Sequence, residues 1–256
     1  MTALLDAQQK TYKRKPKETP PEFIAGVASV LVIGLFITTF IMQPFEIPSG
    51  SMEKTLLIGD HVFVDRLTPT IKAGYLGLLL PYRPVRRGDI IVFLHPAQRG
   101  MYVVKRVIGI PGDRIHLRNG VVYRNGEALQ EPYIMPRSGR HSDFGDEFPQ
   151  FTPPVSPDVP PEWTMIKRDN TQGEDLVVPA DDYFGMGDNR ENSLDSRYWG
   201  FIPRQNIVGR PMFVYWSFAT PESQPGSLAE RAGNVLRVMI HFFDRTRWSR
   251  TFHMVR

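Results

Sequence analysis

A run of uncharged residues, Phe23–Met42 (FIAGVASVLVIGLFITTFIM), most constrains what this chain can fold into. As an α-helix it would extend about 30 Å, which matches the hydrocarbon core of one bilayer. It shows no polar stripe of the kind expected on the core helix of a soluble domain. A cleaved signal peptide needs a shorter apolar stretch that ends in small residues, whereas this one continues into MQPFEIP. We therefore expect an uncleaved transmembrane helix at 23–42.

The segment before this run, residues 1–22, is basic. Its cationic side chains are Lys10, Lys13, Arg14, Lys15 and Lys17, against few acidic ones. Positive charge beside a span tends to remain cytoplasmic, which predicts a cytoplasmic N-terminal tail. Everything from Gln43 onward is then expected outside the cytoplasm.

Composition excludes several classes of function. The 256 residues carry a net charge of +4, but no aromatic-basic RNA motif, zinc-finger spacing or helix-turn-helix pattern, so we expect no nucleic-acid partner. The chain has no cysteine, which excludes disulfides, thiolate metal sites and cysteine catalysis. It also has no HExxH or paired-ligand spacing, so we expect neither a metal nor a cofactor.

After the span, the sequence changes to short runs rich in Val, Ile and Phe, which predict β-strands. These runs are His61–Arg66, Asp89–Leu94, Met101–Ile110 and Asn206–Phe218. Asn119-Gly120 and Asn125-Gly126 predict two tight hairpins, because both residue types accept a positive φ. We expect a mostly β fold, with an antiparallel β-sheet domain at 43–220.

Three other stretches have less specific patterns. Residues 132–161 are rich in proline and predict an irregular insertion in the β domain. Residues 221–256 form a basic tail in which Leu228–Phe243 has helical spacing; a membrane-surface amphipathic helix and a docked terminal helix both fit. The apolar stretch Tyr75–Pro81 fits core packing and contact with lipid equally well.

Ser51, in PSGSMEKTL shortly after the span, is a candidate nucleophile that needs a base. None of the six histidines lies in a recognisable Ser-His-Asp context. A lysine can serve if burial keeps it neutral. Lys54 lies in a polar stretch, whereas Lys105 is flanked by valines in YVVKRVIGI. Because burial disfavours the charged amine, the sequence favours Lys105 over Lys54.

Ser51 and Lys54 also form a Ser-x-x-Lys pair, as in penicillin-binding proteins and β-lactamases. That class also carries Ser-Asp-Asn and Lys-Thr-Gly elements, and neither occurs here. Tyr123-Arg124-Asn125 could pass for a Tyr-x-Asn variant, but the Asn-Gly turn explains it more simply. Taken singly, Gly50, Gly112 and Gly187 are also explained by turns alone.

Three motifs resemble those of the bacterial type I signal peptidases. They are IPSGSMEKTLLIGD at 47–60, VVKRVIGIPGD at 103–113 and MGDNRENSLDSRYWGFIP at 186–203. The motifs occur in family order after a single span, and the resemblance extends to about Trp216. It implies a β catalytic domain of the Ser/Lys type, anchored in the bacterial inner (cytoplasmic) membrane and facing its periplasmic or extracytoplasmic side. It also implies a serine endopeptidase that removes signal peptides from exported proteins after small residues of the A-x-A type.

The resemblance also implies roles for individual residues. Ser51 would be the nucleophile and Lys105 the general base, with Ser49 and the Ser51 amide forming the oxyanion hole and Ser193 orienting the lysine. Structural support is expected from Asp188, Asn189, Asp195 and Arg197. Substrate-binding residues are expected to be Phe45, Ile47, Pro48, Met52, Val103 and Val104. The chain departs from the family at Glu53-Lys54, where a proline commonly precedes the threonine, so we expect Lys54 to be a solvated surface charge.

The expected partners are preproteins with signal peptides and the lipid bilayer, with the protein export machinery as a further candidate. A related self-cleaving Ser/Lys protease, such as the repressors of the DNA damage response, is disfavoured by the anchor and by the lack of a DNA-binding module. A catalytically inactive, membrane-tethered β-domain that binds export partners is the remaining alternative.

Overall fold

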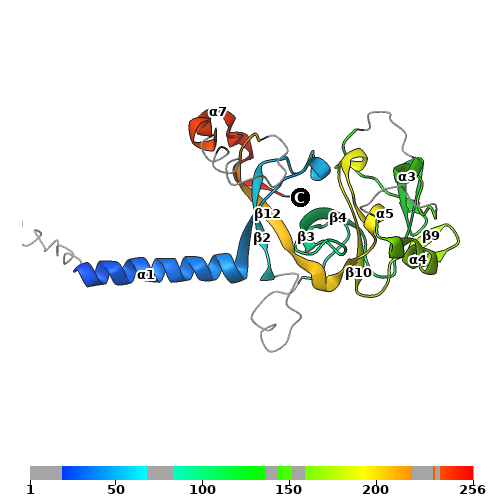
Figure 1. Ribbon diagram of the computed structural model, residues 1–256, viewed down its shortest axis with the longest axis horizontal. Coiled ribbons are helices and arrows are strands. Elements are labelled where there is room, and N and C mark those ends of the chain that lie inside the picture. Colours follow the sequence, from blue (N-terminus) through cyan, green and yellow to red (C-terminus); the bar gives the residue numbers. More distant parts are fainter. Residues whose placement is uncertain are drawn as a thin grey trace, which may run out of the picture. The chain divides into compact units, whose positions relative to one another are not determined.

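The computed structural model describes residues 19–67, 83–136, 143–151, 159–220, 233 and 237–255 (Figure 1). The chain forms two compact units, residues 1–39 and 40–256. Most of the predicted cytoplasmic tail and the apolar stretch Tyr75–Pro81 lie outside the described residues.

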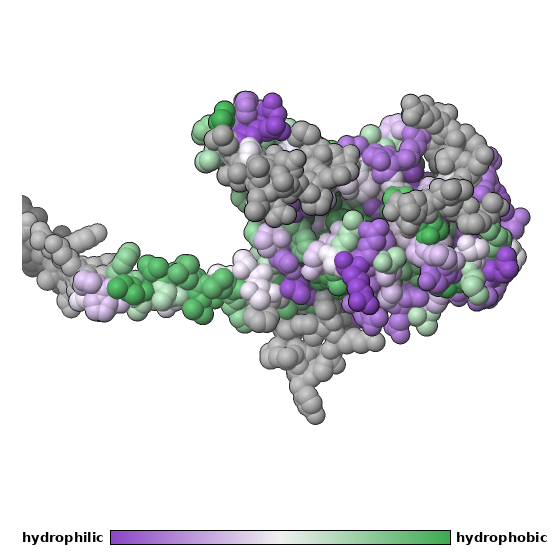
Figure 2. Space-filling view, viewed as in Figure 1, coloured by the Kyte–Doolittle hydropathy of each residue, from purple (hydrophilic) through white to green (hydrophobic). Residues whose placement is uncertain are grey.

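The first unit contains helix α1, Pro20–Phe36, which continues into the π-helical turn η2, Ile37–Ile41. Prolines suit the first turn of a helix, where their missing N–H removes no helical bond. No α1 residue is buried, and the face seen in Figure 2 is apolar along most of its length. Among the described residues, Pro20–Thr39 is the one helix long and apolar enough to cross a membrane. The helix thus begins before the predicted Phe23, and Met42 already belongs to the first strand.

The larger sheet of the second unit is antiparallel, in the order β1-β2-β12-β3-β4-β10-β11, with β13 paired to β12. Its strands are β1 (Met42–Glu46), β2 (Asp60–Asp65), β3 (Ile90–Leu94), β4 (Tyr102–Gly109), β10 (Asp182–Met186), β11 (Ile202–Pro203), β12 (Ile207–Ser217) and β13 (His253–Met254). Each of the four predicted strand runs forms one of these strands. The predicted mostly β, antiparallel fold is confirmed.

The smaller sheet has the order β7-β6-β5-β9-β8 and is also antiparallel. Its strands are β5 (Arg114–Arg118), β6 (Val121–Arg124), β7 (Glu127–Ala128), β8 (Thr171–Gln172) and β9 (Asp175–Val177). Asn119-Gly120 and Asn125-Gly126 connect β5 to β6 and β6 to β7, and all four residues have a positive φ. The two predicted hairpins are therefore present.

Short helices connect the strands. They are η3 (Gly50–Met52), α3 (Asp143–Asp146), α4 (Pro161–Asp169), η5 (Arg190–Asn192), α5 (Ser196–Trp199), η6 (Arg204–Asn206), α7 (Phe242–Arg245) and η7 (Trp248–Arg250). The predicted insertion contributes α3 and also Phe148, which is buried and forms a bridge with Leu117. Within that insertion, residues 137–142 and 152–158 lie outside the described residues.

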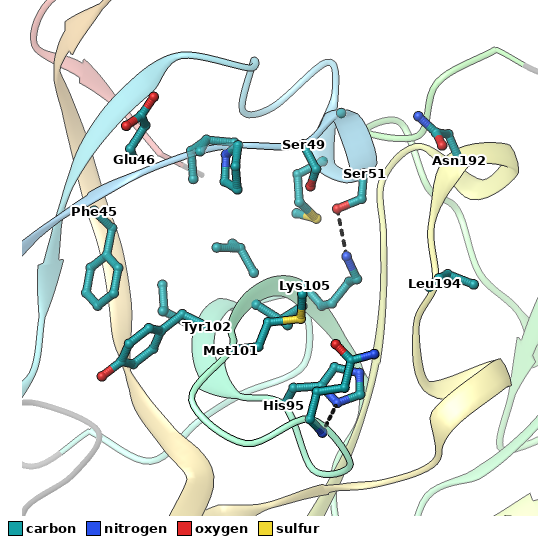
Figure 3. Close-up of a pocket in the computed structure, with 18 of the residues that line it drawn as sticks. Phe45, Glu46, Ser49, Ser51, His95, Met101, Tyr102, Lys105, Asn192 and Leu194 are labelled. Carbon is teal, nitrogen blue, oxygen red and sulfur yellow. Dashed lines mark hydrogen bonds between the residues drawn. The ribbon is translucent and has the colours of Figure 1, made fainter. Parts of the chain in front are cut away.

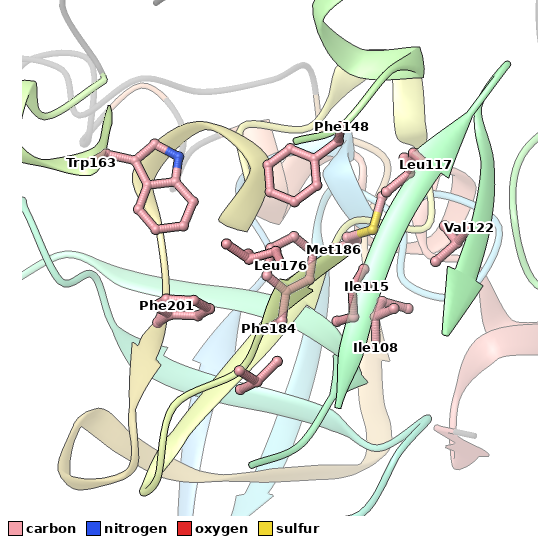
Figure 4. Packing of buried hydrophobic residues seen from close by; sticks show 11 residues of the cluster. Ile108, Ile115, Leu117, Val122, Phe148, Trp163, Leu176, Phe184, Met186 and Phe201 are labelled. Atoms are coloured by element: carbon pink, nitrogen blue, oxygen red, sulfur yellow. The ribbon is translucent and has the colours of Figure 1, made fainter. Parts of the chain in front are cut away.

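Strand β4 separates two apolar clusters of the core. Ile108 belongs to the cluster between β10 and the smaller sheet, where Phe148, Trp163 and Phe184 also pack (Figure 4). Val107, its neighbour, belongs to a different cluster. Successive side chains of a strand point to opposite faces, so β4 is buried on both sides. This burial of β4 sets the environment of Lys105.

The described C-terminal residues return to the larger sheet. Besides the pairing of β13 with β12, the Arg250 Nε donates to Asp60 Oδ1 at 3.0 Å, and the Arg247 Nη1 donates to the Ile58 carbonyl at 2.9 Å. Asp60 is fully buried. Part of the predicted tail at 221–256 is therefore integral to this sheet, while much of Leu228–Phe243 lies outside the described residues.

We expect Arg250→Ala to lower the free energy of unfolding by about 3 kcal/mol, because it leaves the buried Asp60 carboxylate without its cation. Urea unfolding followed by tryptophan fluorescence measures this change. Arg245→Ala is the matched control: this side chain is exposed, so its removal should change the free energy by no more than about 0.5 kcal/mol. Equal losses in the two variants would contradict the role given to Arg250.

Candidate active site

Ser51 lies in the loop between β1 and β2, residues 47–59, which we call the nucleophile loop. It is the central residue of η3 and is half-buried. The loop is anchored by two apolar side chains, Met52 and Leu56, which are buried in the core beneath β2 and β12. The Ser51 carbonyl also accepts a hydrogen bond from the Asn189 amide at 3.1 Å. Both contacts fix the backbone that carries the hydroxyl.

The Lys105 amine donates a hydrogen bond to the Ser51 hydroxyl, with 2.7 Å between Nζ and Oγ (Figure 3). Lys105 is on β4, and its side chain is only 3% exposed. The alternation of the strand places it on the same face as Val103 and Val107, both of which pack in an apolar cluster. The structure therefore brings together the two residues predicted as nucleophile and base.

Burial lowers the pKa of Lys105 to about 8. The negative charges of Asp195 and Asp188 act in the opposite direction, and the positive charge of Arg197 lowers the pKa further. An exposed lysine has a pKa near 10.5 and is almost entirely charged at neutral pH. Lys105 can thus be substantially neutral at mildly alkaline pH, which a general base requires.

Asp195 is fully buried and joins several elements of the site. Its carboxylate accepts hydrogen bonds from Arg197 Nε at 2.8 Å, from the Gly187 amide at 3.1 Å and from the Ser193 hydroxyl at 2.9 Å. Burial alone would raise the pKa of Asp195, but Arg197 overcomes this effect and the pKa is lowered. In the described part of the chain, the Ser193 hydroxyl makes no hydrogen bond to Lys105. It binds Asp195, whose negative charge raises the pKa of Lys105.

Asp188 anchors the nucleophile loop through its side-chain carboxylate. It is fully buried and forms a bidentate pair with Arg106, at 2.8 Å for both contacts. The Thr55 hydroxyl donates to the same carboxylate at 2.5 Å. The neighbouring Asn189 donates its side-chain amide to Glu53 at 3.2 Å. These bonds connect the strand that carries Lys105 to the loop that carries Ser51.

Lys54 is directed away from Ser51. Its backbone has a φ of 84°, and its amine donates to the Pro132 and Ile134 carbonyls, the latter at 3.1 Å. The side chain is exposed, as predicted, but it is bound rather than only solvated. The amine of the Ser-x-x-Lys pair therefore does not contact the candidate nucleophile in this structure.

The segment that Lys54 contacts, Glu131–Met135, was not predicted to be part of the site. We call it the clamp segment. Glu131 forms a buried ion pair with Arg190 (2.9 Å between Nη1 and Oε2), and the Met135 amide donates to the Asp188 carbonyl at 3.0 Å. The Arg106 guanidinium lies 4.0 Å from the centre of the Tyr133 ring. The sequence of the clamp segment, EPYIM, gave no indication of these long-range contacts.

Beside the Ser51–Lys105 pair lies a pocket of about 450 Å³. All six predicted substrate-binding residues line it, as does Ser49: Phe45, Ile47, Pro48, Met52, Val103 and Val104. Sequence reasoning missed other lining residues, which are Glu46, Val92, His95, Gln98, Met101, Tyr102, Asn192, Leu194 and Trp199. Tyr102 packs edge-on against Phe45, with 5.1 Å between ring centres. This aromatic pair joins the two walls of the pocket.

Two strands present unpaired backbone edges near this pocket, among the residues that the structure describes. β1 is an edge strand, paired only with β2. β4 pairs with β10 only from Arg106 onward, so its residues 102–105 pair with β3 alone. Figure 3 shows β1 and β4 on opposite sides of the pocket. An extended peptide can pair with such edges.

A serine hydroxyl bonded to a buried lysine, next to an apolar pocket, is the arrangement of a serine hydrolase of the Ser/Lys type. A family model described as "Signal peptidase, peptidase S26" matches residues 21–216. Signal peptidase I of Buchnera aphidicola subsp. Acyrthosiphon pisum is 30% identical over 89% of this chain and 86% of the relative. Signal peptidase I of Pseudomonas aeruginosa is 32% identical over 75% of this chain and 71% of the relative.

A solved structure of a signal peptidase I from Enterococcus faecalis V583 aligns with a TM-score of 0.31 and 29% identity, over 50% of this chain and 97% of that chain. The family model covers most of the sequence, and the curated relatives match most of their own length. The chain belongs to the signal peptidase family, peptidase S26, and the resemblance seen in the three motifs is confirmed. It is a serine endopeptidase.

We expect Gly187→Ala to reduce activity about 100-fold, since a displacement of about 1 Å at a reacting group has this effect. A Cβ at Gly187 would lie 2.5 Å from the Ser51 carbonyl oxygen and 2.3 Å from the Ser193 hydroxyl. Peptide hydrolysis measures the loss, and thermal unfolding reports whether the variant is folded. Gly233→Ala, where an added Cβ has no neighbour within 4 Å, should retain full activity. Full activity in Gly187→Ala would show that the close approach is not required.

Proposed function

We propose that the chain removes signal peptides from exported preproteins by acyl transfer through Ser51. The hydrogen bond between the Ser51 hydroxyl and the buried Lys105 amine carries this proposal. Neutral Lys105 takes the Ser51 proton while Oγ attacks the scissile carbonyl carbon. The Ser51 amide and the Ser49 hydroxyl stabilise the oxyanion, a type of contact worth about 3 kcal/mol.

The second half of the reaction reuses the same two groups. The C–N bond breaks, and the Lys105 ammonium returns its proton to the departing amine. Lys105 then takes a proton from a water molecule, whose oxygen attacks the carbonyl carbon of the Ser51 ester. The bond between Oγ and the acyl carbon breaks, the Lys105 ammonium returns its proton to Ser51 Oγ, and the signal peptide is released as a carboxylic acid. In this proposal Ser193 is the residue that orients the lysine, and it also holds Asp195, whose charge acts on the amine. Asp188, Asn189 and Arg197 hold the surrounding backbone.

The form of the pocket supports a substrate with small side chains in extended conformation. Its walls are apolar, and two strand edges are available to pair with the peptide backbone. Phe45, Ile47, Pro48, Met52, Val103 and Val104 would contact the signal-peptide side of the scissile bond. Small residues of the A-x-A type at the end of a signal peptide suit such a pocket.

The proposal places this reaction at a bacterial inner membrane. Helix α1 would cross the bilayer once, with the basic N-terminal tail in the cytoplasm and the β domain on the periplasmic or extracytoplasmic side. Ser51 follows the helix by few residues, which keeps the nucleophile within reach of a peptide leaving the bilayer. The lipid bilayer is thus a partner, and the export machinery that delivers preproteins is a second one.

We expect Ser51→Ala and Lys105→Ala each to abolish cleavage of a secretory precursor by the detergent-solubilised protein, since each removes one member of the pair. Lys54→Ala should keep at least about half of the activity, because the Lys54 amine binds backbone carbonyls away from Ser51. Gel analysis of precursor and product measures all three. An inactive Lys54→Ala with an active Lys105→Ala would exchange the roles of the two lysines. If the wild-type protein binds the precursor without cutting it, the inactive tethered domain is the better description.

We expect kcat/KM to rise about tenfold per pH unit below pH 8 and to level off above about pH 9. Lys105 has a pKa of about 8, so below that pH its amine is protonated and cannot accept the Ser51 proton. Initial rates on a peptide substrate between pH 6 and about pH 10 measure the profile. A profile that is flat across this range, or that falls as the pH rises, would exclude Lys105 as the base.

A further inference from the structure

The pocket continues past the Ser51–Lys105 pair, on the side away from the predicted substrate-binding residues. Figure 3 shows Asn192 and Leu194 on one side of the pair, with Phe45 and Tyr102 on the other. Asn192 ends η5, and Leu194 follows it in the connection to α5. Both residues line the same pocket as Ser51. The pocket therefore has a second wall that strands β1 and β4 do not form.

Leu194 is an exposed apolar side chain between two buried residues. It is 49% exposed, whereas Ser193 is 7% exposed and Asp195 is fully buried. The backbone on both sides is fixed, because Asp195 binds the Ser193 hydroxyl, the Gly187 amide and Arg197. Leu194 cannot turn inward without breaking these buried hydrogen bonds. Single exposed apolar side chains are common on protein surfaces, but Leu194 lies on the wall of the pocket that contains the reacting groups, where a bound substrate can cover it.

The direction of the substrate identifies what covers Leu194. In the proposed function, the acyl half of the substrate lies between β1 and β4, and the amine half leaves on the other side of the Ser51 hydroxyl. That side is the wall of Asn192 and Leu194. Neither residue carries a charge.

We propose that Leu194 contacts the side chain of the residue that follows the scissile bond and that it favours apolar residues there over charged ones. This inference rests on the proposed function and adds to it a determinant for the first residue of the released protein. Leu194 acts through contact alone and takes no part in proton transfer.

Charge substitution at Leu194 tests the contact. Three peptides would be compared, identical up to the scissile bond and carrying Leu, Asp or Lys directly after it. We expect the wild-type protein to cleave the Leu peptide about tenfold faster, in kcat/KM, than either charged one. Leu194→Glu should raise the Lys-to-Asp ratio of kcat/KM about fivefold, and Leu194→Lys should lower it by a similar factor. A substitution that only disturbed the structure would not raise the Lys-to-Asp ratio in one variant and lower it in the other.

Two controls separate this inference from other effects. Val121→Glu and Val121→Lys place the same charges on an exposed apolar residue of the smaller sheet and should leave the ratio unchanged. The preference for Ala over Val directly before the scissile bond should be unchanged in both Leu194 variants. If the wild-type protein cleaves the peptides but both Leu194 variants keep its Lys-to-Asp ratio, or shift it in one direction, the inference is overturned. If the wild-type protein cleaves none of them, the proposed function fails and this inference fails with it.

Discussion

The burial of the Lys105 amine is the constraint on which the rest of the site depends. A solvated lysine is protonated at neutral pH and cannot accept a proton from serine, so the amine has to be kept out of water. The valines on its face of β4 provide the apolar surroundings. The buried negative charge of Asp195 raises the pKa of Lys105, which opposes the effect of burial, and Arg197 neutralises much of that charge. Because Arg197 pairs with it, the Asp195 carboxylate can hold the surrounding backbone while the pKa of Lys105 stays below its usual value.

The same burial requires that distant parts of the chain meet closely. The nucleophile loop, β4 and the segment after β10 are far apart in sequence. Each of them forms hydrogen bonds of about 3 Å with the other two. Arg106 illustrates the connection, because it follows Lys105 directly and its guanidinium binds Asp188, which in turn binds Thr55 of the loop. Gly187 is needed at the centre of this arrangement, since no Cβ fits between the Ser51 carbonyl and Ser193.

Local patterns in the sequence were sufficient for much of the fold. Period-two runs of branched residues gave the strands, and the Asn-Gly pairs gave both hairpins, because these features depend on near neighbours only. The choice of Lys105 over Lys54 also rested on local surroundings, and the hydrogen bond to Ser51 agrees with it. The clamp segment escaped prediction because Glu131 and Arg190 come together only through the folded chain. Leu194 escaped for a similar reason, since its exposure follows from hydrogen bonds made by its buried neighbours.

The ion pair between Arg250 and Asp60 has a consequence for how the protein matures. Arg250 also donates to the Thr55 carbonyl at 3.0 Å, so this residue of η7 holds both ends of the segment from Thr55 to Asp60. Ribosomes release residues in order, and a nascent chain that has not yet reached residue 250 lacks this restraint. The nucleophile loop therefore gains this restraint late in synthesis, although Ser51 itself is translated early.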